Sequence, residues 1–150
     1  MKSSPFYGLP SAGRERGVGG ENMPYNVLIV DDSQTMRQVI RKSVTISGFD
    51  LGDCWEAGDG QEALKLLSSH SVDLILVDLN MPVMNGLEMV RELQKKEEYC
   101  HIPVVLITTE GSEKRLEEAY AIGIKGYIQK PFHPETLRDV LSRIMEGTHA

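Results

Sequence analysis

The sequence contains only two cysteines, Cys54 and Cys100, which form neither a CxxC pair nor part of a Cys/His cluster. A disulfide scaffold or a cysteine-based zinc site is therefore not expected, and both thiols are predicted to be free. Basic residues are in the minority, with 16 Lys and Arg against 22 Asp and Glu and a formal net charge of -6. This acidic balance gives no reason to expect binding to nucleic acid or to anionic membranes.

Long apolar runs are missing as well. Each run spans about four or five residues, far short of the roughly 20 residues that cross a bilayer. The start, Met1 to Pro5, lacks the apolar core of a signal peptide. We therefore expect a cytoplasmic protein with no membrane association. At 150 residues, 41% of them hydrophobic, the chain has enough length for one folded domain with a full core.

The first 23 residues differ in composition from the rest of the chain. They are rich in Gly, Ser and Pro and show little periodic apolar content, which is typical of flexible segments. We predict a flexible N-terminal extension over residues 1–23 and a single folded domain over residues 24–150.

From Tyr25 onward, short apolar runs alternate with segments of helical periodicity. Five strands are predicted, each followed by a helix, at residues 27–30, 51–57, 72–77, 104–107 and 126–129. Strict alternation predicts an α/β fold with a doubly wound, five-stranded parallel sheet and five helices that cover both faces. In such sheets, ligands bind beyond the carboxyl ends of the strands.

Polar residues suited to phosphate and cation chemistry follow four of these strands. They are Asp31 with Asp32, Asp78 with Asn80, Thr108, and Lys130. Singly, each residue is expected to be structural, because Asp, Asn, Ser and Thr at strand-to-helix junctions are ordinary caps and turn formers. Their joint occurrence at one edge of one sheet predicts a functional site there.

Three carboxylates in one crevice, from Asp31, Asp32 and Asp78, would repel one another unless positive charge compensates them. An oxygen-only ligand set favours a hard cation, and Mg²⁺ suits it because that ion takes one or two carboxylates together with phosphate oxygens. Lys130 supplies a second positive charge. Beside Mg²⁺, an Asp carboxylate can attack a phosphoryl group and form an acyl phosphate, while Thr108 donates a hydrogen bond to a phosphoryl oxygen.

In these motifs the sequence resembles the receiver domains of two-component response regulators, and within that family the single-domain chemotaxis regulators of the CheY type. The resemblance covers about residues 25 to 146. It rests on Asp31-Asp32, residues 33–37, Asp78-Leu79-Asn80-Met81-Pro82 with Gly86, Thr108, and Lys130-Pro131-Phe132. It implies the strand order 2-1-3-4-5.

The resemblance also implies how the acidic residues divide their tasks. Asp78 would accept the phosphoryl group from a histidine kinase. The side chains of Asp32 and Asp78 would bind Mg²⁺, Asn80 would bind it through the backbone carbonyl, and Asp31 would act mostly through water.

Further roles follow from the same resemblance. Thr108 and Tyr127 would form the switch pair, and Lys130 would contact the phosphoryl group, with a cis peptide expected before Pro131. The surface over residues 113–145, made by the fourth helix, fifth strand and fifth helix, would bind a downstream protein.

The implied function is a standalone response regulator in chemotaxis, where it would control the flagellar motor. It would not be an enzyme beyond its own phosphorylation and dephosphorylation. A phosphatase is a further candidate partner, and the chain is expected to be a monomer. Because no output domain follows the predicted domain, direct DNA binding is not expected. A phosphorelay shuttle or a stress-signalling receiver is the alternative role.

Two departures and two competing functions remain open at this point. Thr109 is bulkier than the small residue that the family usually has after the switch Thr, and the segment before Met23 has no counterpart. A phosphatase of the haloacid dehalogenase type would need an acidic residue two positions after Asp78, where this chain has Asn80. A receiver-like module that binds partners without phosphate is the third possibility.

Overall fold

The computed structural model describes residues 24–147, so the extension predicted over residues 1–23 lies outside the described residues. Strands and helices alternate strictly along this part of the chain, as predicted. The strands are β1 (Tyr25–Val30), β2 (Leu51–Ala57), β3 (Leu74–Val77), β4 (Val104–Thr108) and β5 (Gly126–Gln129). The helices are α1 (Gln34–Ser47), α2 (Gly60–Leu67), α3 (Gly86–Gln94), α4 (Glu113–Ile122) and α5 (Pro134–Gly147).

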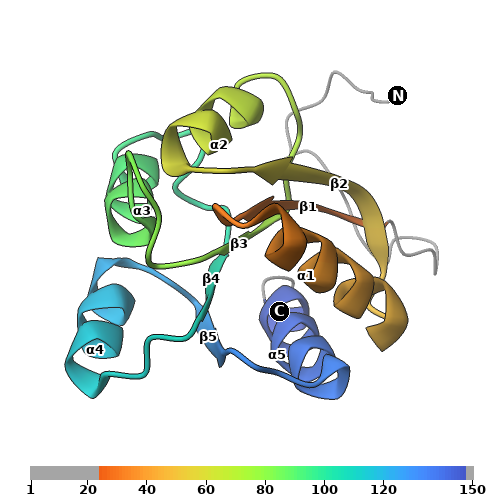
Figure 1. The fold of residues 1–150 in the computed structure, drawn as a ribbon. Coiled ribbons are helices and arrows are strands. Elements are labelled where there is room, and N and C mark those ends of the chain that lie inside the picture. The colour runs from red at the N-terminus through yellow and green to blue at the C-terminus, as the bar shows by residue number, and fades with distance from the viewer. Residues whose placement is uncertain (1–23, 148–150) are drawn as a thin grey trace.

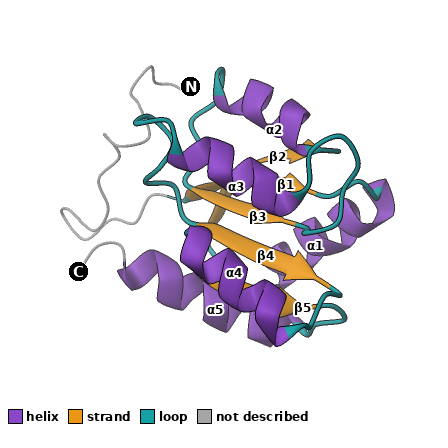
Figure 2. Cartoon of the chain, turned by 90° about the vertical axis from the view of Figure 1, so that its left-hand side faces the viewer, coloured by secondary structure: helices purple, strands orange, loops and turns teal. Residues whose placement is uncertain are grey.

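The strands form one parallel sheet in the order β2-β1-β3-β4-β5. Helices α1 and α5 cover one face, and α2, α3 and α4 cover the other (Figure 1). Figure 2 shows α2, α3 and α4 in front of the strands, with the loops that follow the strands gathered at one end of the sheet. The predicted doubly wound α/β fold is therefore confirmed, and so is its strand order.

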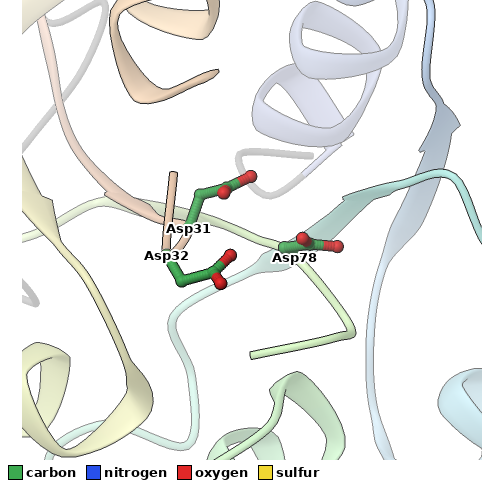
Figure 3. A group of neighbouring side chains, drawn as sticks. All are labelled: Asp31, Asp32 and Asp78. Carbon is green, nitrogen blue, oxygen red and sulfur yellow. The ribbon is translucent and has the colours of Figure 1, made fainter. Parts of the chain in front are cut away.

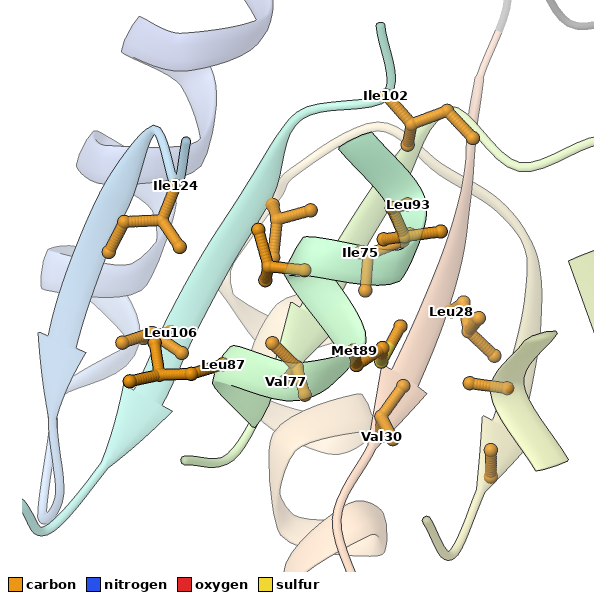
Figure 4. Packing of buried hydrophobic residues seen from close by; sticks show 14 of the residues in the cluster. Leu28, Val30, Ile75, Val77, Leu87, Met89, Leu93, Ile102, Leu106 and Ile124 are labelled. Atoms are coloured by element: carbon orange, nitrogen blue, oxygen red, sulfur yellow. The ribbon is translucent and has the colours of Figure 1, made fainter. Parts of the chain in front are cut away.

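Two apolar layers hold the helices to the sheet. Residues of β1, β3 and β4 point alternately into each layer, so Leu28 contacts the layer of α2, α3 and α4 whereas Val27 contacts the layer of α1 and α5. Figure 4 shows the first layer, with Leu87 and Leu93 of α3 lying over the central strands. Because these strands are buried on both faces, their polar residues are confined to the strand ends. This confinement places the polar groups at the edge where the loops begin.

Helix boundaries follow local signals in the sequence. Ser33 caps α1, since its hydroxyl accepts a hydrogen bond from the Met36 N–H at 3.1 Å. Gly48 ends this helix with φ 88°, a left-handed conformation that glycine adopts without steric cost. At α3, Asn85 and Glu88 form a reciprocal capping box. A glycine after a helical apolar pattern predicts such a helix end, and Gly48 confirms it.

Three strand boundaries differ from the prediction. β1 begins at Tyr25 instead of residue 27, because Tyr25 pairs with Leu51 of β2. β3 begins at Leu74 instead of residue 72, because the Asp73 carboxylate accepts the backbone N–H of Asn26 at 2.8 Å in place of a strand carbonyl. β4 extends to Thr108, whose carbonyl accepts the N–H of Lys130 at 2.8 Å. Thr108 is therefore the last residue of the strand and not the first residue of the loop.

Apolar residues recur at helical spacing along α1 and α4, a pattern that predicts their burial. Two of them, Val39 and Tyr120, are exposed instead. The fully buried residues are Ile40 and Val44 in α1 and Ala119 in α4, while Leu116 and Ile122 of α4 pack against the core partly buried. These helices therefore bury narrower stripes than the pattern predicts.

Candidate functional site

Asp31, Asp32 and Asp78 meet at the carboxyl edge of the sheet (Figure 3). β1 and β3 pair in parallel with Val30 opposite Val77, and the Asp78 N–H donates to the Val30 carbonyl at 2.9 Å. One carboxylate oxygen from each of the three residues lies within 4.8 Å of the other two. Asp31 is buried, Asp78 is half-buried and Asp32 is exposed. The acidic pocket formed by these three residues therefore opens to solvent on the side of Asp32.

Lys130 reaches this acidic pocket from the end of β5. Its Nζ donates to Asp31 Oδ2 at 2.8 Å and lies 3.5 Å from Asp78 Oδ2. The lysine side chain is only 11% exposed, so this is not an ordinary solvated surface charge. The peptide bond between Lys130 and Pro131 is cis, as expected. Lys130 thus balances part of the negative charge of the carboxylates.

Thr108 and Asn80 flank the acidic pocket in different environments. Thr108 is fully buried, and its Oγ1 accepts the Glu110 N–H at 3.3 Å. Asn80 is exposed, and its backbone N–H lies 3.5 Å from Asp78 Oδ1. Thr109 follows Thr108 and is exposed.

Tyr127 is connected to the same loop as Thr108. Its hydroxyl donates to the carbonyl of Glu110 at 2.8 Å. Burial, and to a smaller extent the negative charge of Glu110, raises the pKa of the Tyr127 hydroxyl, so the neutral donor form is favoured. Thr108 therefore contacts the backbone N–H of Glu110, and Tyr127 contacts the backbone carbonyl of the same residue.

Sequence reasoning did not assign a role to Glu110 or to Arg37. Glu110 joins Thr108 and Tyr127 through its backbone, so its side-chain type carried no signal, and only its position two residues after Thr108 could have indicated it. Arg37 donates from Nη1 to the Asp31 carbonyl at 2.6 Å and from Nε to Glu56 at 2.9 Å. The contact with the Asp31 carbonyl could not be predicted, because the two residues are six positions apart and the acceptor is a backbone group.

The loop that follows Asp78 is shaped by close approaches. A Cβ at Gly86 would lie 2.5 Å from the Asp78 carbonyl, so only glycine fits there. A Cβ at Gly60 would lie 2.8 Å from Met84 Cγ, which shows that this loop packs directly on the start of α2. Val83 has φ 66°, an unusual conformation for a β-branched residue. These contacts fix the path of the chain away from Asp78.

The donor set of the acidic pocket fits a hard divalent cation. Among the described residues, this is the one group of three or more His, Cys, Asp or Glu side chains close enough to share an ion, and it offers carboxylate oxygens alone. Such ligands suit Mg²⁺, and a pocket that is open on the side of Asp32 leaves room for water and for phosphate oxygens.

Comparison with known proteins agrees with this geometry. Residues 27–142 match the response regulator receiver domain family. The chain belongs to this family. Receiver domains bind Mg²⁺ at an acidic pocket, and they are signalling switches of two-component systems, not enzymes in the usual sense. In the part of the chain that the structure describes, no helix combines the length and apolar character needed to span a membrane.

Individual relatives place this receiver domain among those of the CheY type. Chemotaxis protein CheY-3 from Vibrio cholerae is 38% identical over 125 residues, which are 83% of this chain and 95% of that protein. The structure of the chemotaxis response regulator CheY4 of Vibrio cholerae has a TM-score of 0.73 and 37% identity, and the match covers 81% of this chain and 99% of that chain.

A third relative bears on the metal. The receiver domain of a sensor histidine kinase from Pseudomonas aeruginosa PAO1 has a magnesium ion coordinated in its active site cleft. It matches with a TM-score of 0.70 and 25% identity over 81% of this chain and 97% of that chain.

Proposed function

We propose that this receiver domain is a phosphorylation-controlled switch in chemotaxis, in which Asp78 accepts a phosphoryl group from a histidine kinase in a Mg²⁺-dependent reaction. The observation that carries the proposal is the convergence of Asp78 with Asp31, Asp32 and Lys130 from three strand ends. The similarity to chemotaxis proteins supports the pathway, with flagellar motor control as the output. A phosphorelay or stress-signalling role is the runner-up.

The carboxylate of Asp78 is placed to act as the nucleophile. One of its oxygens would bond to phosphorus while the P–N bond to a kinase histidine protonated at its other ring nitrogen breaks, which leaves an acyl phosphate on Asp78 and a neutral imidazole on the kinase. Lys130 Nζ, 3.5 Å from Asp78 Oδ2, would pair with a phosphoryl oxygen. The Thr108 hydroxyl would donate a hydrogen bond to another.

The proposed cation ligands are the side chains of Asp32 and Asp78 and the backbone carbonyl of Asn80, with Asp31 acting mostly through water. When bound, Mg²⁺ would neutralise charge on the phosphoryl oxygens. Asp31 also accepts the Ser33 N–H at 2.9 Å in addition to its bond with Lys130, so its carboxylate is already occupied. This supports an indirect role for Asp31 and a direct one for Asp32.

The switch would operate through Glu110. Thr108 Oγ1 accepts the Glu110 N–H, and Tyr127 donates to the carbonyl of the same residue. If Thr108 turns toward the phosphoryl group, its hydrogen bond with Glu110 must change, and the acceptor of Tyr127 then changes with it. The surface over residues 113–145 would respond, and a downstream protein would bind there.

Other parts of the proposal concern the chain as a whole. The working unit is a domain over residues 24–150 that carries an extension at residues 1–23, acts as a cytoplasmic monomer and is reset by a phosphatase. A haloacid dehalogenase-type phosphatase is disfavoured, because Asn80 has no proton to give at the position where that chemistry needs an acid.

Phosphorylation by a small-molecule donor tests the proposal. Incubation with acetyl phosphate and Mg²⁺ should add about 80 Da to the intact mass, and Asp78→Asn should abolish this addition. Asp53→Asn is the matched control, because Asp53 is an exposed carboxylate on β2, and this variant should be labelled like the wild type. Equal labelling of Asp78→Asn would contradict the assignment.

A further inference from the structure

Arg37 lies near the start of α1 and reaches back toward the end of β1. Its Nη1 donates to the Asp31 carbonyl at 2.6 Å, and its Nε donates to Glu56 Oε1 at 2.9 Å. Side chains on a helix lean toward its N-terminus, which allows a residue six positions after Asp31 to make this contact. The side chain is only 16% exposed. Arg37 is therefore a largely buried cation beside the acidic pocket.

The Asp31 carbonyl belongs to the peptide unit that joins Asp31 to Asp32. Asp31 is 1% exposed, and its N–H donates to the Ala57 carbonyl of β2 at 3.0 Å. A buried carbonyl needs a hydrogen-bond donor, and Arg37 supplies it. Because the orientation of this peptide sets the direction in which Asp32 projects, the Arg37 bond bears directly on where the Asp32 carboxylate lies.

Glu56 holds the guanidinium in place. The planar fork of Arg37 uses Nε for Glu56 and Nη1 for Asp31, so the two acceptors together fix its orientation. Arg41 Nη1 donates to the other Glu56 oxygen at 3.1 Å and is the partly exposed neighbour in this group. The second guanidinium nitrogen of Arg41 donates to the Cys54 carbonyl, not to Asp31. Arg41 therefore shares Glu56 with Arg37 and is a natural control.

We propose that Arg37 is a positioning residue that orients the Asp31–Asp32 peptide and so holds the Asp32 carboxylate in place for a divalent cation. This inference rests on the proposed Mg²⁺ site. Charge alone acts in the opposite direction, because a guanidinium beside the acidic pocket repels a cation. Loss of Arg37 therefore weakens Mg²⁺ binding if the residue positions the ligands, and strengthens it if only its charge matters.

Calorimetric titration of the unphosphorylated full chain with Mg²⁺ separates these outcomes. Arg37→Ala should weaken Mg²⁺ binding about 10-fold, the usual scale for losing a group that orients a ligand. Arg37→Lys keeps the charge but cannot donate to Glu56 and to the Asp31 carbonyl at the same time. Its affinity for Mg²⁺ should therefore lie between those of Arg37→Ala and the wild type. Arg41→Ala should bind Mg²⁺ with the wild-type affinity.

The rate of phosphorylation by acetyl phosphate provides a second measurement. With Arg37→Ala, the Mg²⁺ concentration for half-maximal rate should rise by the same factor, while the rate at saturating Mg²⁺ recovers. A variant that merely folds poorly would lower the maximal rate instead. Melting curves in EDTA establish whether each variant is folded. If Arg37→Ala does not fold, the Mg²⁺ affinity of Arg37→Lys tests the inference.

Three results would overturn the inference. One is Mg²⁺ affinity in Arg37→Ala that equals or exceeds that of the wild type, and another is wild-type affinity in Arg37→Lys. In both cases the wild type still binds Mg²⁺, and the proposed function stands without a role for Arg37. The third is a wild type that does not bind Mg²⁺ at all, which would overturn the metal site together with this inference.

Discussion

Lys130 Nζ lies 2.8 Å from Asp31 Oδ2, although 99 positions separate the two residues in the sequence. They follow β5 and β1, and two other strands lie between these in the sheet. The Asp31 side chain is almost completely buried, so its carboxylate depends on the partners that the fold brings to it. Lys130 thus reaches across the carboxyl edge of the sheet and forms an ion pair with Asp31, the most buried carboxylate of the acidic pocket.

Lys130→Ala should lower the free energy of unfolding by about 2 kcal/mol in the absence of Mg²⁺, because it leaves the buried Asp31 carboxylate without its charged donor. Mg²⁺ should restore part of this loss by supplying positive charge to the same group. Urea unfolding in EDTA and in Mg²⁺ measures both effects. Lys125→Ala, which removes an exposed lysine next to β5, is the control, and an equal loss in both variants would contradict the prediction.

Mg²⁺ should raise the melting temperature, because it binds the assembled carboxylates and not the unfolded chain. At 100 times its dissociation constant the stabilisation would be about 2.7 kcal/mol. Thermal unfolding with and without Mg²⁺ checks this. Asp32→Asn should reduce the shift, whereas Asp53→Asn, which removes an exposed carboxylate from β2, should keep it. A shift that survives in both variants would place the ion elsewhere.

Thr109→Ala should speed phosphorylation by acetyl phosphate, because the exposed Thr109 side chain adds bulk next to Thr108 at the end of β4 and alanine is smaller. Its effect on stability should stay within about 0.5 kcal/mol, as is usual for an exposed position. Stopped reactions followed by intact mass give the rate. An unchanged rate would show that Thr109 does not limit access to Asp78.

Val83→Gly should stabilise the protein by about 1 kcal/mol, because Val83 has φ 66° and glycine adopts that conformation without strain. The side chain is 72% exposed, so little packing is lost with it. Val83→Ala is the control and should gain less, since alanine still carries a Cβ in this conformation. Chemical unfolding of the three proteins measures the difference, and a less stable glycine variant would contradict the prediction.

Cys54 should react with iodoacetamide far more slowly than Cys100 at pH 8. Burial raises the pKa of the Cys54 thiol from 9.0 to about 11, so its thiolate fraction is on the order of 100-fold lower than that of an ordinary thiol. Both thiols are free, and Cys100 is exposed. Peptide mapping by mass spectrometry gives the two rates, and the difference should vanish in urea.

The same shift has a consequence for stability at high pH. Because the folded pKa of Cys54 is above the unfolded one, the thiol contributes stability fully below about pH 9, and that contribution is lost as the pH rises toward 11. Cys54→Ser should reduce the fall in stability over this range. A variant with the same pH profile as the wild type would contradict the assignment to Cys54.

Much of the fold could be read from local patterns. The apolar runs that became β1, β3 and β4 are buried on both faces, and such strands need little context to be recognised. The end of α1 at Gly48 is also predictable, because the left-handed conformation there is a local preference of glycine. Where burial depended on a neighbour, local reasoning failed, as at Val39 and Tyr120, which carry the right period but lie outside the contact between helix and sheet.

The candidate site divides in the same way. Asp31, Asp32, Asp78 and Lys130 could be chosen from the sequence, because parallel strands end at one edge and each residue lies one or two positions after a strand. The sequence by itself therefore determined which side chains are available and at which end of the sheet they lie. Only the tertiary structure decided the contacts of Arg37 with the Asp31 carbonyl and of Tyr127 with Glu110, because backbone acceptors are the same at every residue and distances between elements are set by packing.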